Sequence, residues 1–268
     1  MKFVCFGSPK GGVGKTMLTA NIAYALQRLG MNVVVIDFDP QNALRHHFGI
    51  SLEDGRGYVS SCLSTDDWRP FLRETRSGVR LLVYGDATHE ERRRFDMTLE
   101  QNPNFLVERL RPLLFGEPNA VLLADMPPGP SPALEAYCRL NPLCVAVLLA
   151  DTASTALLPA IERGEFFGPN AIGRTFYVVN QYDIRSALNR DVSAFLRERL
   201  GAALLGLVHR DEAVKEAHAR QISVFQHAYA SAAVEDLTNI ARNIQRLLSV
   251  GDGIEEQQQA PFFSSPHW

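Results

Sequence analysis

Residues 7–16 decide the fold, and they read Gly7-Ser-Pro-Lys-Gly-Gly-Val-Gly-Lys-Thr16. The apolar run Phe3–Phe6 precedes them, and a stretch with helical spacing, Gly14–Leu29, follows. A glycine-rich loop between a strand and a helix can turn successive backbone N–H groups inward, and the helix N-terminus adds partial positive charge. The stretch therefore predicts a phosphate-binding loop at the start of an α/β domain.

The rest of the chain alternates short apolar runs with longer helical patterns. This alternation is typical of a mostly parallel central sheet with helices on both faces, and we predict one such α/β domain over residues 1–250. The further predicted strands are Val33–Ile36, Arg80–Tyr84, Val121–Ala124, Leu143–Leu149, Thr175–Val179 and Ala203–Val208. The further predicted helices are Asn104–Leu114, Ala133–Leu140, Ser186–Leu200 and Ala233–Leu248.

Two regions fit the alternation poorly. Residues 51–100 carry seven arginines between Arg69 and Arg94, interleaved with acidic residues, and we predict an ion-paired helical insertion, with a partner surface as the alternative. Residues 251–268 are acidic and rich in glutamine, and they end with the aromatic side chains Phe262, Phe263 and Trp268. We expect a flexible tail there, with a docking peptide as the alternative.

Composition narrows the functional classes. The 27 basic and 30 acidic residues sum to −3, and residues 1–250 sum to zero, so the chain lacks the basic excess of a constitutive nucleic-acid binder. The longest wholly apolar run, Leu143–Ala150, is far shorter than the roughly 20 residues that span a bilayer, and the N-terminal apolar stretch is too short for a signal peptide. We expect a cytoplasmic protein with no membrane anchor of its own, brought to the inner membrane or cell pole only by partners.

Cysteine and histidine spacing predicts no metal centre. The four cysteines, Cys5, Cys62, Cys138 and Cys144, contain no C-x-x-C pair, and buried free thiols explain them best. The seven histidines lack ligand spacing, and we predict that His46-His47 is a surface pair on a helix.

The residues of the loop have distinct predicted roles. Lys15 is expected to reach the β- and γ-phosphates of a nucleotide, and the Thr16 hydroxyl to bind Mg²⁺. The other nucleotide-binding positions are Gly11, Gly12, Val13, Gly14 and Met17.

One departure from the ordinary loop pattern is informative. The first glycine of G-x-x-x-x-G-K-[ST] would fall at Pro9, and a second lysine, Lys10, stands before Gly11-Gly12. The K-G-G-x-G-K-T form resembles the deviant Walker A loop of the ParA/MinD superfamily of P-loop ATPases. This resemblance implies that Lys10 reaches across a dimer interface to the phosphates of the partner subunit's ATP, much as an arginine finger does.

Two acidic strand ends extend the resemblance. Asp37 and Asp39 stand where the superfamily carries D-x-D-P-Q, which implies Asp37 near Mg²⁺ and Asp39 orienting the attacking water. Asp125 resembles the Walker B aspartate that holds Mg²⁺ through water, and Gly129 resembles a γ-phosphate sensor. Taken alone, an aspartate at a strand end could be a helix N-cap. The carboxyl ends of parallel strands are, however, where α/β folds place their chemistry.

Recognition of the base rests on weaker matches. Asn180 matches the asparagine that resembling ATPases place on the adenine edge, although an asparagine at a strand end is often a turn residue. Arg210 and Asp211 fall where relatives pack a short segment on the base. Many relatives carry a proline where this chain has His209.

A narrower resemblance covers roughly residues 1–248. The chain is similar there to the BcsQ family of MinD-like ATPases. Beyond the ATPase motifs, the similarity lies in Gly57-Tyr58, Asp67-Trp68, the Leu81–Gly85 strand with Glu90-Glu91 after it, and His209–Val214. This resemblance implies an ATP-dependent, dimerising, slow Mg²⁺-dependent ATPase switch in bacterial cellulose biosynthesis and secretion. Its partners would be a second copy and components of the cellulose synthase complex. A ParA-type partition ATPase that binds nonspecific DNA and a nonhydrolysing ATP-bound scaffold are the alternatives.

Overall fold

An eight-stranded sheet forms the centre of the molecule in the computed structural model, which describes the backbone of residues 2–51, 53–117 and 119–258 and side chains as far as Ser249. The strand order is β3-β4-β2-β5-β1-β6-β7-β8, and every neighbouring pair is parallel except β3 with β4. All seven predicted strands are present, and β3 is additional. The strands are β1 (Lys2–Gly7), β2 (Asn32–Asp37), β3 (Leu72–Glu74), β4 (Arg80–Leu82), β5 (Ala120–Asp125), β6 (Leu143–Leu149), β7 (Thr175–Tyr182) and β8 (Leu204–His209).

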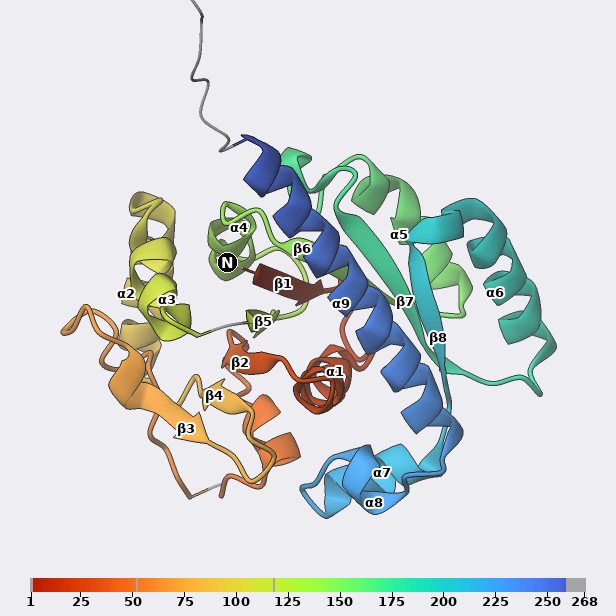
Figure 1. Ribbon diagram of the computed structural model, residues 1–268, viewed down its shortest axis with the longest axis horizontal. Helices are drawn as coiled ribbons and strands as arrows, with labels where there is room; N and C mark the ends of the chain where they lie inside the picture. The colour runs from red at the N-terminus through yellow and green to blue at the C-terminus, as the bar shows by residue number, and fades with distance from the viewer. Residues whose placement is uncertain (1, 52, 118, 259–268) are drawn as a thin grey trace, which may run out of the picture.

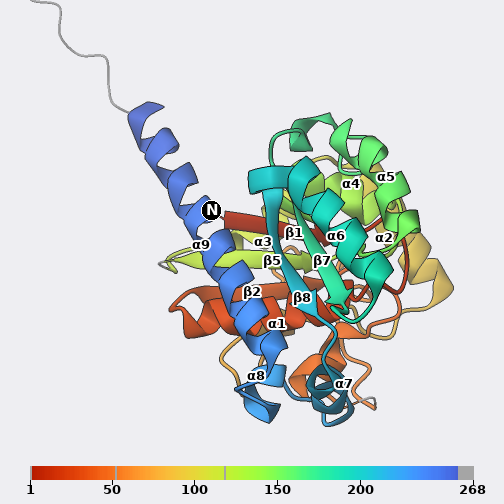
Figure 2. The ribbon, with the colours of Figure 1, turned by 90° about the vertical axis from the view of Figure 1, so that its right-hand side faces the viewer.

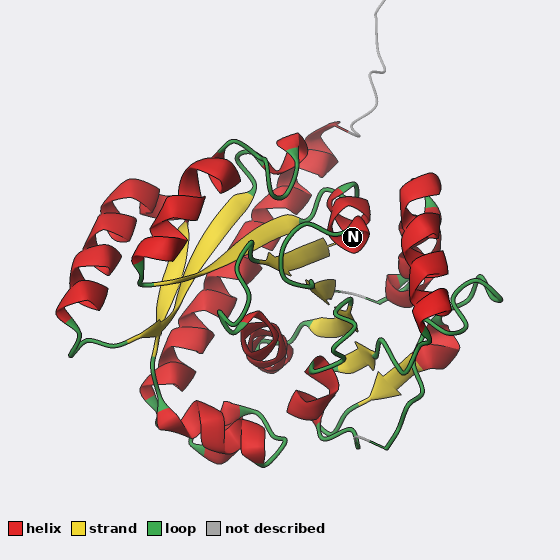
Figure 3. Cartoon of the chain, turned by 180° about the vertical axis from the view of Figure 1, so that it is seen from behind, coloured by secondary structure: helices red, strands yellow, loops and turns green. Residues whose placement is uncertain are grey.

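Helices cover both faces of the sheet, which confirms the predicted fold class (Figure 1). One face is covered by α1 (Lys15–Arg28), α7 (Glu212–Ala219), α8 (Val224–His227) and α9 (Ala232–Gln258). The other is covered by α2 (His89–Gln101), α3 (Phe105–Leu114), α4 (Pro132–Cys138), α5 (Thr152–Glu162) and α6 (Ala187–Leu200). Seen from behind, the strands form a twisted row with helices on either side (Figure 3).

Burial on both faces explains why the central strands are apolar throughout. All six residues of β5 are buried, because helices pack on each side of it. The parallel register places Asp37 of β2 directly opposite Asp125 of β5. On the other side of β5, Asp125 lies opposite Phe6 of β1. The carboxyl ends of these three strands therefore meet at one edge of the sheet, where the glycine-rich loop begins.

Residues 51–100 are not the helical insertion that we predicted. Among the described residues of this region, α2 alone is an α-helix, and it begins with a capping box between Thr88 and Glu91. The rest is loop, one turn of 3₁₀-helix at Arg69–Phe71, and the strands β3 and β4. Because β4 pairs with β2, this region extends the main sheet instead of standing apart from it. The expected ion pairing is present, for example between Arg69 and Asp67.

The C-terminal boundary also differs from the prediction. Helix α9 packs against β8 and α1 and continues to Gln258, so residues 251–258 of the predicted flexible tail are helical. Figure 2 shows the C-terminal end of α9 projecting past the sheet. The three tail aromatics, Phe262, Phe263 and Trp268, lie outside the described residues. Within the described ranges, no helix combines the length and apolar character needed to cross a membrane.

Candidate nucleotide-binding site

The loop between β1 and α1 has the backbone shape that its glycines predict. Gly12 and Gly14 adopt positive φ values of 73° and 86°, a region that side chains with a Cβ rarely occupy. Helix α1 starts at Lys15, so its first N–H groups face the loop. The N-terminus of a 14-residue helix under a glycine-rich turn is suited to binding phosphate.

Asn180 supports this loop from the end of β7. Its amide Nδ2 donates to the carbonyl of Val13 at 2.8 Å, and its side chain is almost fully buried. A Cβ added at Gly14 would lie only 2.3 Å from that Nδ2 atom, so the position requires glycine for space as well as for φ. The Asn180 Oδ1 atom is buried without a hydrogen-bond partner among the described residues. A contact with adenine stays a prediction.

Lys15, Thr16 and Asp125 come together beneath the loop. The Thr19 hydroxyl donates to Asp125 Oδ1 at 3.2 Å, and the Thr16 side chain and Lys15, only 7% exposed, also stabilise the carboxylate. Burial raises the pKa of Asp125 to about 6, although these three neighbours act to lower it. Asp125 Oδ2 is buried with no hydrogen-bond partner in the described part of the chain.

Asp37 faces the same space and organises the loop that follows β2. Its two carboxylate oxygens accept hydrogen bonds from the N–H of Asp39 at 2.9 Å and of Leu44 at 3.3 Å. Burial and repulsion from Asp125 raise the pKa of Asp37 well above its usual range. Asp39 is half-buried in the loop, where its Oδ1 accepts from the Gln41 N–H at 2.9 Å. Asp37 thus closes β2 and Asp39 lies in the loop after it, while their roles toward Mg²⁺ and the attacking water stay predictions.

The donor set fits ATP and Mg²⁺. Two buried carboxylates with raised pKa values and one unpartnered oxygen form a site that a divalent cation would stabilise. Thr16, Asp37 and Asp125 would hold the ion, and Lys15 with the loop N–H groups would hold the phosphates. When bound, Mg²⁺ supplies charge neutralisation at the phosphate oxygens.

Gly129 lies against the phosphate loop. Its N–H donates to the carbonyl of Ser8 at 3.1 Å, and it adopts a φ of 77°. A Cβ added at Gly11 would lie 3.8 Å from Pro128, so the two loops are in close contact. The Gly129 N–H, predicted as a γ-phosphate sensor, is thus bonded to the loop that would hold that phosphate.

The Lys10 side chain contacts Asp151, a residue that the sequence did not indicate. Its Nζ lies 2.6 Å from Oδ2 of Asp151, while Oδ1 of Asp151 caps α5 by accepting from the Ser154 N–H. Burial acts to raise the pKa of Asp151, but the hydrogen bonds from Lys10 and Ser154 outweigh it and the pKa is lowered. The Asp151-Thr-Ala-Ser154 pattern is an N-cap signal, yet nothing local links it to Lys10.

The residues predicted to pack on the base have structural partners. Asp211 caps α7 by accepting from the Ala213 N–H at 2.9 Å, and its other oxygen accepts from the Ala233 N–H at 3.4 Å. Arg210 is exposed, and its N–H donates to the Tyr182 carbonyl at 2.9 Å. Their contact with a nucleotide stays a prediction.

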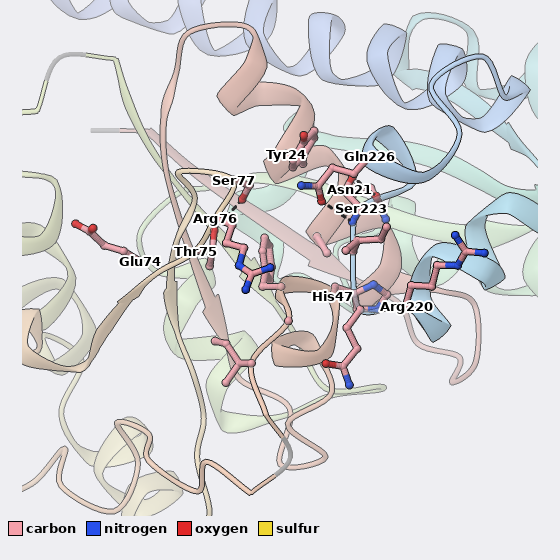
Figure 4. Close-up of a pocket in the computed structure, with 16 residues that line it drawn as sticks. Asn21, Tyr24, His47, Glu74, Thr75, Arg76, Ser77, Arg220, Ser223 and Gln226 are labelled. Atoms are coloured by element: carbon pink, nitrogen blue, oxygen red, sulfur yellow. Dashed lines mark hydrogen bonds between the residues drawn. The ribbon is translucent and has the colours of Figure 1, made fainter.

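A separate cavity of about 480 Å³ lies between α1, the 3₁₀-helix η1 (Leu44–Phe48), the β3–β4 turn and the start of α8 (Figure 4). None of the predicted nucleotide-binding residues lines it. His47 lines it and is only 8% exposed, so the predicted surface pair is wrong for this residue. Burial, with the neighbouring His218 and His46, lowers the pKa of His47 to about 3, and its ring stacks on His218 with centroids 4.2 Å apart.

Comparisons with known proteins agree with this fold. The chain is 29% identical over 234 residues to the cellulose biosynthesis protein BcsQ of Salmonella typhimurium, covering 87% of this chain and 89% of the relative. It is 28% identical over 251 residues to the chromosome-partitioning ATPase Soj of Thermus thermophilus, covering 90% and 94%. The septum site-determining protein MinD of Pyrococcus horikoshii, solved with Mg-ADP, matches with a TM-score of 0.72 at 17% identity over 93% of this chain and 98% of that one.

These matches support an ATPase of the MinD/ParA type, and the likeness to MinD confirms the fold. The family model described as cellulose biosynthesis protein BcsQ matches residues 1–244, which contain every residue of the site described above. The chain belongs to the BcsQ family of cellulose biosynthesis proteins.

Proposed function

We propose that this protein is an ATP-dependent dimerising switch that acts in bacterial cellulose biosynthesis and secretion. In the ATP state two copies would face each other across their phosphate loops, and slow Mg²⁺-dependent hydrolysis would separate them. The family match supports the cellulose assignment, and the geometry of the loop supports the switch.

The placement of the two loop lysines carries the proposal. Lys15 is 7% exposed and lies beside Asp125, so it serves the nucleotide of its own subunit. The side chain of Lys10 is 34% exposed and extends out of the loop to Asp151. We propose that this partly exposed ammonium group acts on ATP when a second subunit brings its phosphates to it.

The remaining site residues have separate proposed roles in the switch. Asp39 would orient the attacking water from the loop after β2, while Asp37 and Asp125 hold the ion. The Gly129 N–H would exchange the Ser8 carbonyl for a γ-phosphate oxygen, so the loop would adopt different positions with ATP and ADP. Asn180, Arg210 and Asp211 are proposed to contact the base.

The partners would be a second copy of this chain and components of the cellulose synthase complex. We propose that such partners recruit the protein to the inner membrane or cell pole.

Sedimentation velocity of Lys10→Ala with ATP and Mg²⁺ tests the proposal. We expect the parent to shift from monomer to dimer on adding ATP and Lys10→Ala to stay monomeric while still binding ATP through Lys15. Lys215→Ala is the matched control, because Lys215 is an exposed lysine on α7 that pairs with Glu212 and is not part of the loop. If Lys10→Ala dimerises and hydrolyses ATP like the parent, the trans-lysine mechanism is wrong.

The similarity to Soj supports a second candidate, a partition-type ATPase whose ATP dimer binds nonspecific DNA. DNA binding that requires ATP and weakens steeply with salt would favour it. A nonhydrolysing scaffold is separated from both by single-turnover hydrolysis. The parent should convert bound ATP to ADP and Asp39→Ala should not, whereas equal lack of conversion in both would indicate a scaffold.

A further inference from the structure

The cavity of about 480 Å³ shown in Figure 4 is built from segments that are far apart in the sequence. Hydrogen bonds fix α1 to the start of α8: the Ser223 hydroxyl donates to Asn21 Oδ1 at 2.9 Å, and the Val224 N–H donates to the same atom at 3.1 Å. The end of η1 lies against the connection from α7 to α8, where a Cβ added at Gly49 would lie 3.4 Å from the Gln221 carbonyl oxygen. Cavities of about 300–1,000 Å³ are typical of small-molecule sites, so this one has the size and the fixed walls of such a site.

The charged side chains that line the cavity are mainly basic. Arg76, in the β3–β4 turn, and Arg220, directly after α7, are both exposed, and neither pairs with a carboxylate among the described residues. In Figure 4 the Arg76 guanidinium extends toward the middle of the drawn residues, whereas Glu74 and Arg220 extend outward on opposite sides. The positive charge at the centre and at one rim favours an anionic ligand.

His47 adds a buried polar group whose hydrogen-bonding capacity is unused. Its side chain is 8% exposed, and within the described part of the chain no hydrogen bond reaches either ring nitrogen. The ring stacks on His218, and burial keeps it neutral at pH 7 by lowering its pKa to about 3. One ring nitrogen of a neutral imidazole carries a hydrogen that it can donate. A buried polar group without a partner costs free energy, which a ligand oxygen in the cavity would recover.

Apolar side chains form another part of the lining. Tyr24, Phe48, Ile50 and Ile222 line the cavity, and each is only partly buried against the core. The Tyr24 ring is held in place by stacking on Phe225, with centroids 5.3 Å apart. A ligand that fills the cavity therefore needs an apolar part as well as a charged part.

We propose that this cavity binds a small phosphomonoester, with its phosphate beside Arg76 and His47 and its apolar organic group against Tyr24 and Phe48. A phosphomonoester carries a charge of about −1.5 to −2 at pH 7 and three acceptor oxygens. It therefore matches two arginines and an N–H donor better than a singly charged carboxylate does. None of the predicted nucleotide-binding residues lines the cavity, so this site is separate from the one proposed for ATP.

Isothermal titration calorimetry with phenyl phosphate tests the site in the full chain. We expect saturable binding by the parent, and Arg76→Gln should weaken it at least about tenfold, because a charge-assisted hydrogen bond is lost. Arg242→Gln is the matched control and should bind like the parent, since Arg242 is an exposed arginine of α9 that contacts Asn239 and does not line the cavity. His47→Phe keeps a ring against His218 but removes the N–H, so it should weaken binding roughly three- to tenfold.

The phosphate loop is a second place where phenyl phosphate could bind, and Lys15→Ala separates the two sites. This variant should lose ATP binding and keep phenyl phosphate binding. If it loses both, the phosphate was bound at the loop and the cavity site is overturned. Absence of saturable binding by the parent, or equal weakening in Arg76→Gln and Arg242→Gln, would overturn it too. Inorganic phosphate bound as tightly as phenyl phosphate would overturn the role of the apolar lining, and phenylacetate bound as tightly would overturn the choice of phosphate.

Two elements connect the cavity to the proposed nucleotide site. Helix α1 begins at Lys15, and η1, which contains His47, begins at Leu44, whose N–H donates to Asp37 Oδ2 at 3.3 Å. On the proposed ATP-binding function, we expect an occupied cavity to change the affinity for ATP. Fluorescent ATP is titrated with and without phenyl phosphate: a change in the parent that exceeds the change in Arg76→Gln would support this coupling. An equal change in both, which indicates competition at the loop, or no change in either would contradict it.

Discussion

Lys10 Nζ and Asp151 Oδ2 lie 2.6 Å apart although the two residues are 141 positions apart in the chain. The ion pair holds Lys10 against α5 of its own subunit, so it competes with any use of Lys10 across a dimer interface. About a third of each side chain is exposed, so solvent screens the pair and it is worth about 0.2–1 kcal/mol.

Asp151→Asn tests this competition. Asparagine still caps α5 but removes the charge, so we expect ATP-dependent dimerisation to strengthen by roughly two- to fivefold. Dimer dissociation constants from sedimentation with ATP measure the change. Glu212→Gln, which breaks the exposed pair with Lys215, is the control and should have no effect. A dimer dissociation constant equal to or higher than that of the parent would show that the Lys10–Asp151 pair does not restrain Lys10.

The buried carboxylates predict a pH dependence of stability. The folded-state pKa of Asp125 is raised to about 6, so the native state binds its proton more tightly than the unfolded chain does, where aspartate titrates near 4. The stabilisation is present below about pH 4 and is lost as the pH rises through about 6. For the nucleotide-free protein, we expect Asp125 to lower the unfolding free energy by roughly 1–2 kcal/mol between pH 5 and pH 7.5.

Urea unfolding of Asp125→Asn checks this prediction. The variant should be more stable than the parent at pH 7.5, and its unfolding free energy should lack the fall between pH 5 and pH 7.5 that Asp125 causes. It should also lose Mg²⁺-dependent hydrolysis. Asp183→Asn is the control: hydrogen bonds from Arg185 lower the pKa of Asp183 to about 2, so its contribution is constant in this window. The prediction fails if Asp125→Asn keeps the full decline of the parent.

Gly14 and Gly12 offer a matched pair in the phosphate loop. Both have positive φ, but only Gly14 is crowded, by Asn180 at 2.3 Å, while nothing lies within 4 Å of a Cβ at Gly12. We expect Gly12→Ala to cost about 1–2 kcal/mol of unfolding free energy and Gly14→Ala clearly more, because the Asn180–Val13 bond must also shift. Chemical unfolding and titration of fluorescent ATP measure both. Equal losses in the two variants would argue against the role of Asn180.

Trp68 links residues 51–100 to the body of the protein. It is fully buried, and its ring lies 4.8 Å from that of Tyr58 and 5.8 Å from that of Phe105. We expect Trp68→Ala to cost about 3–5 kcal/mol of unfolding free energy. Trp68→Phe should cost less, because the indole Nε1 is buried without a partner among the described residues. Leu63→Ala, at a site 50% exposed, is the control. A comparable loss of unfolding free energy in that variant would show that Trp68 has no special role in anchoring residues 51–100.

Local chemistry explains which elements could be predicted. The seven strands were predictable because each contains a short apolar run, and α1 because it follows the glycine-rich loop. The short strand β3 was missed because it forms only by pairing with β4 at the edge of the sheet. The start of α2 could have been found from Thr88 and Glu91, whose spacing is that of a capping box.

The sequence by itself determined the phosphate loop, the acidic strand ends and the α/β class, because glycine conformation, strand periodicity and residue chemistry act over a few positions. Only the tertiary structure decided which distant side chains meet. It paired Lys10 with Asp151, buried His47, and set Cys5 of β1 beside Cys144 of β6. These contacts depend on sheet order and helix packing, which are set by burial of the whole core and leave no mark in the neighbouring residues.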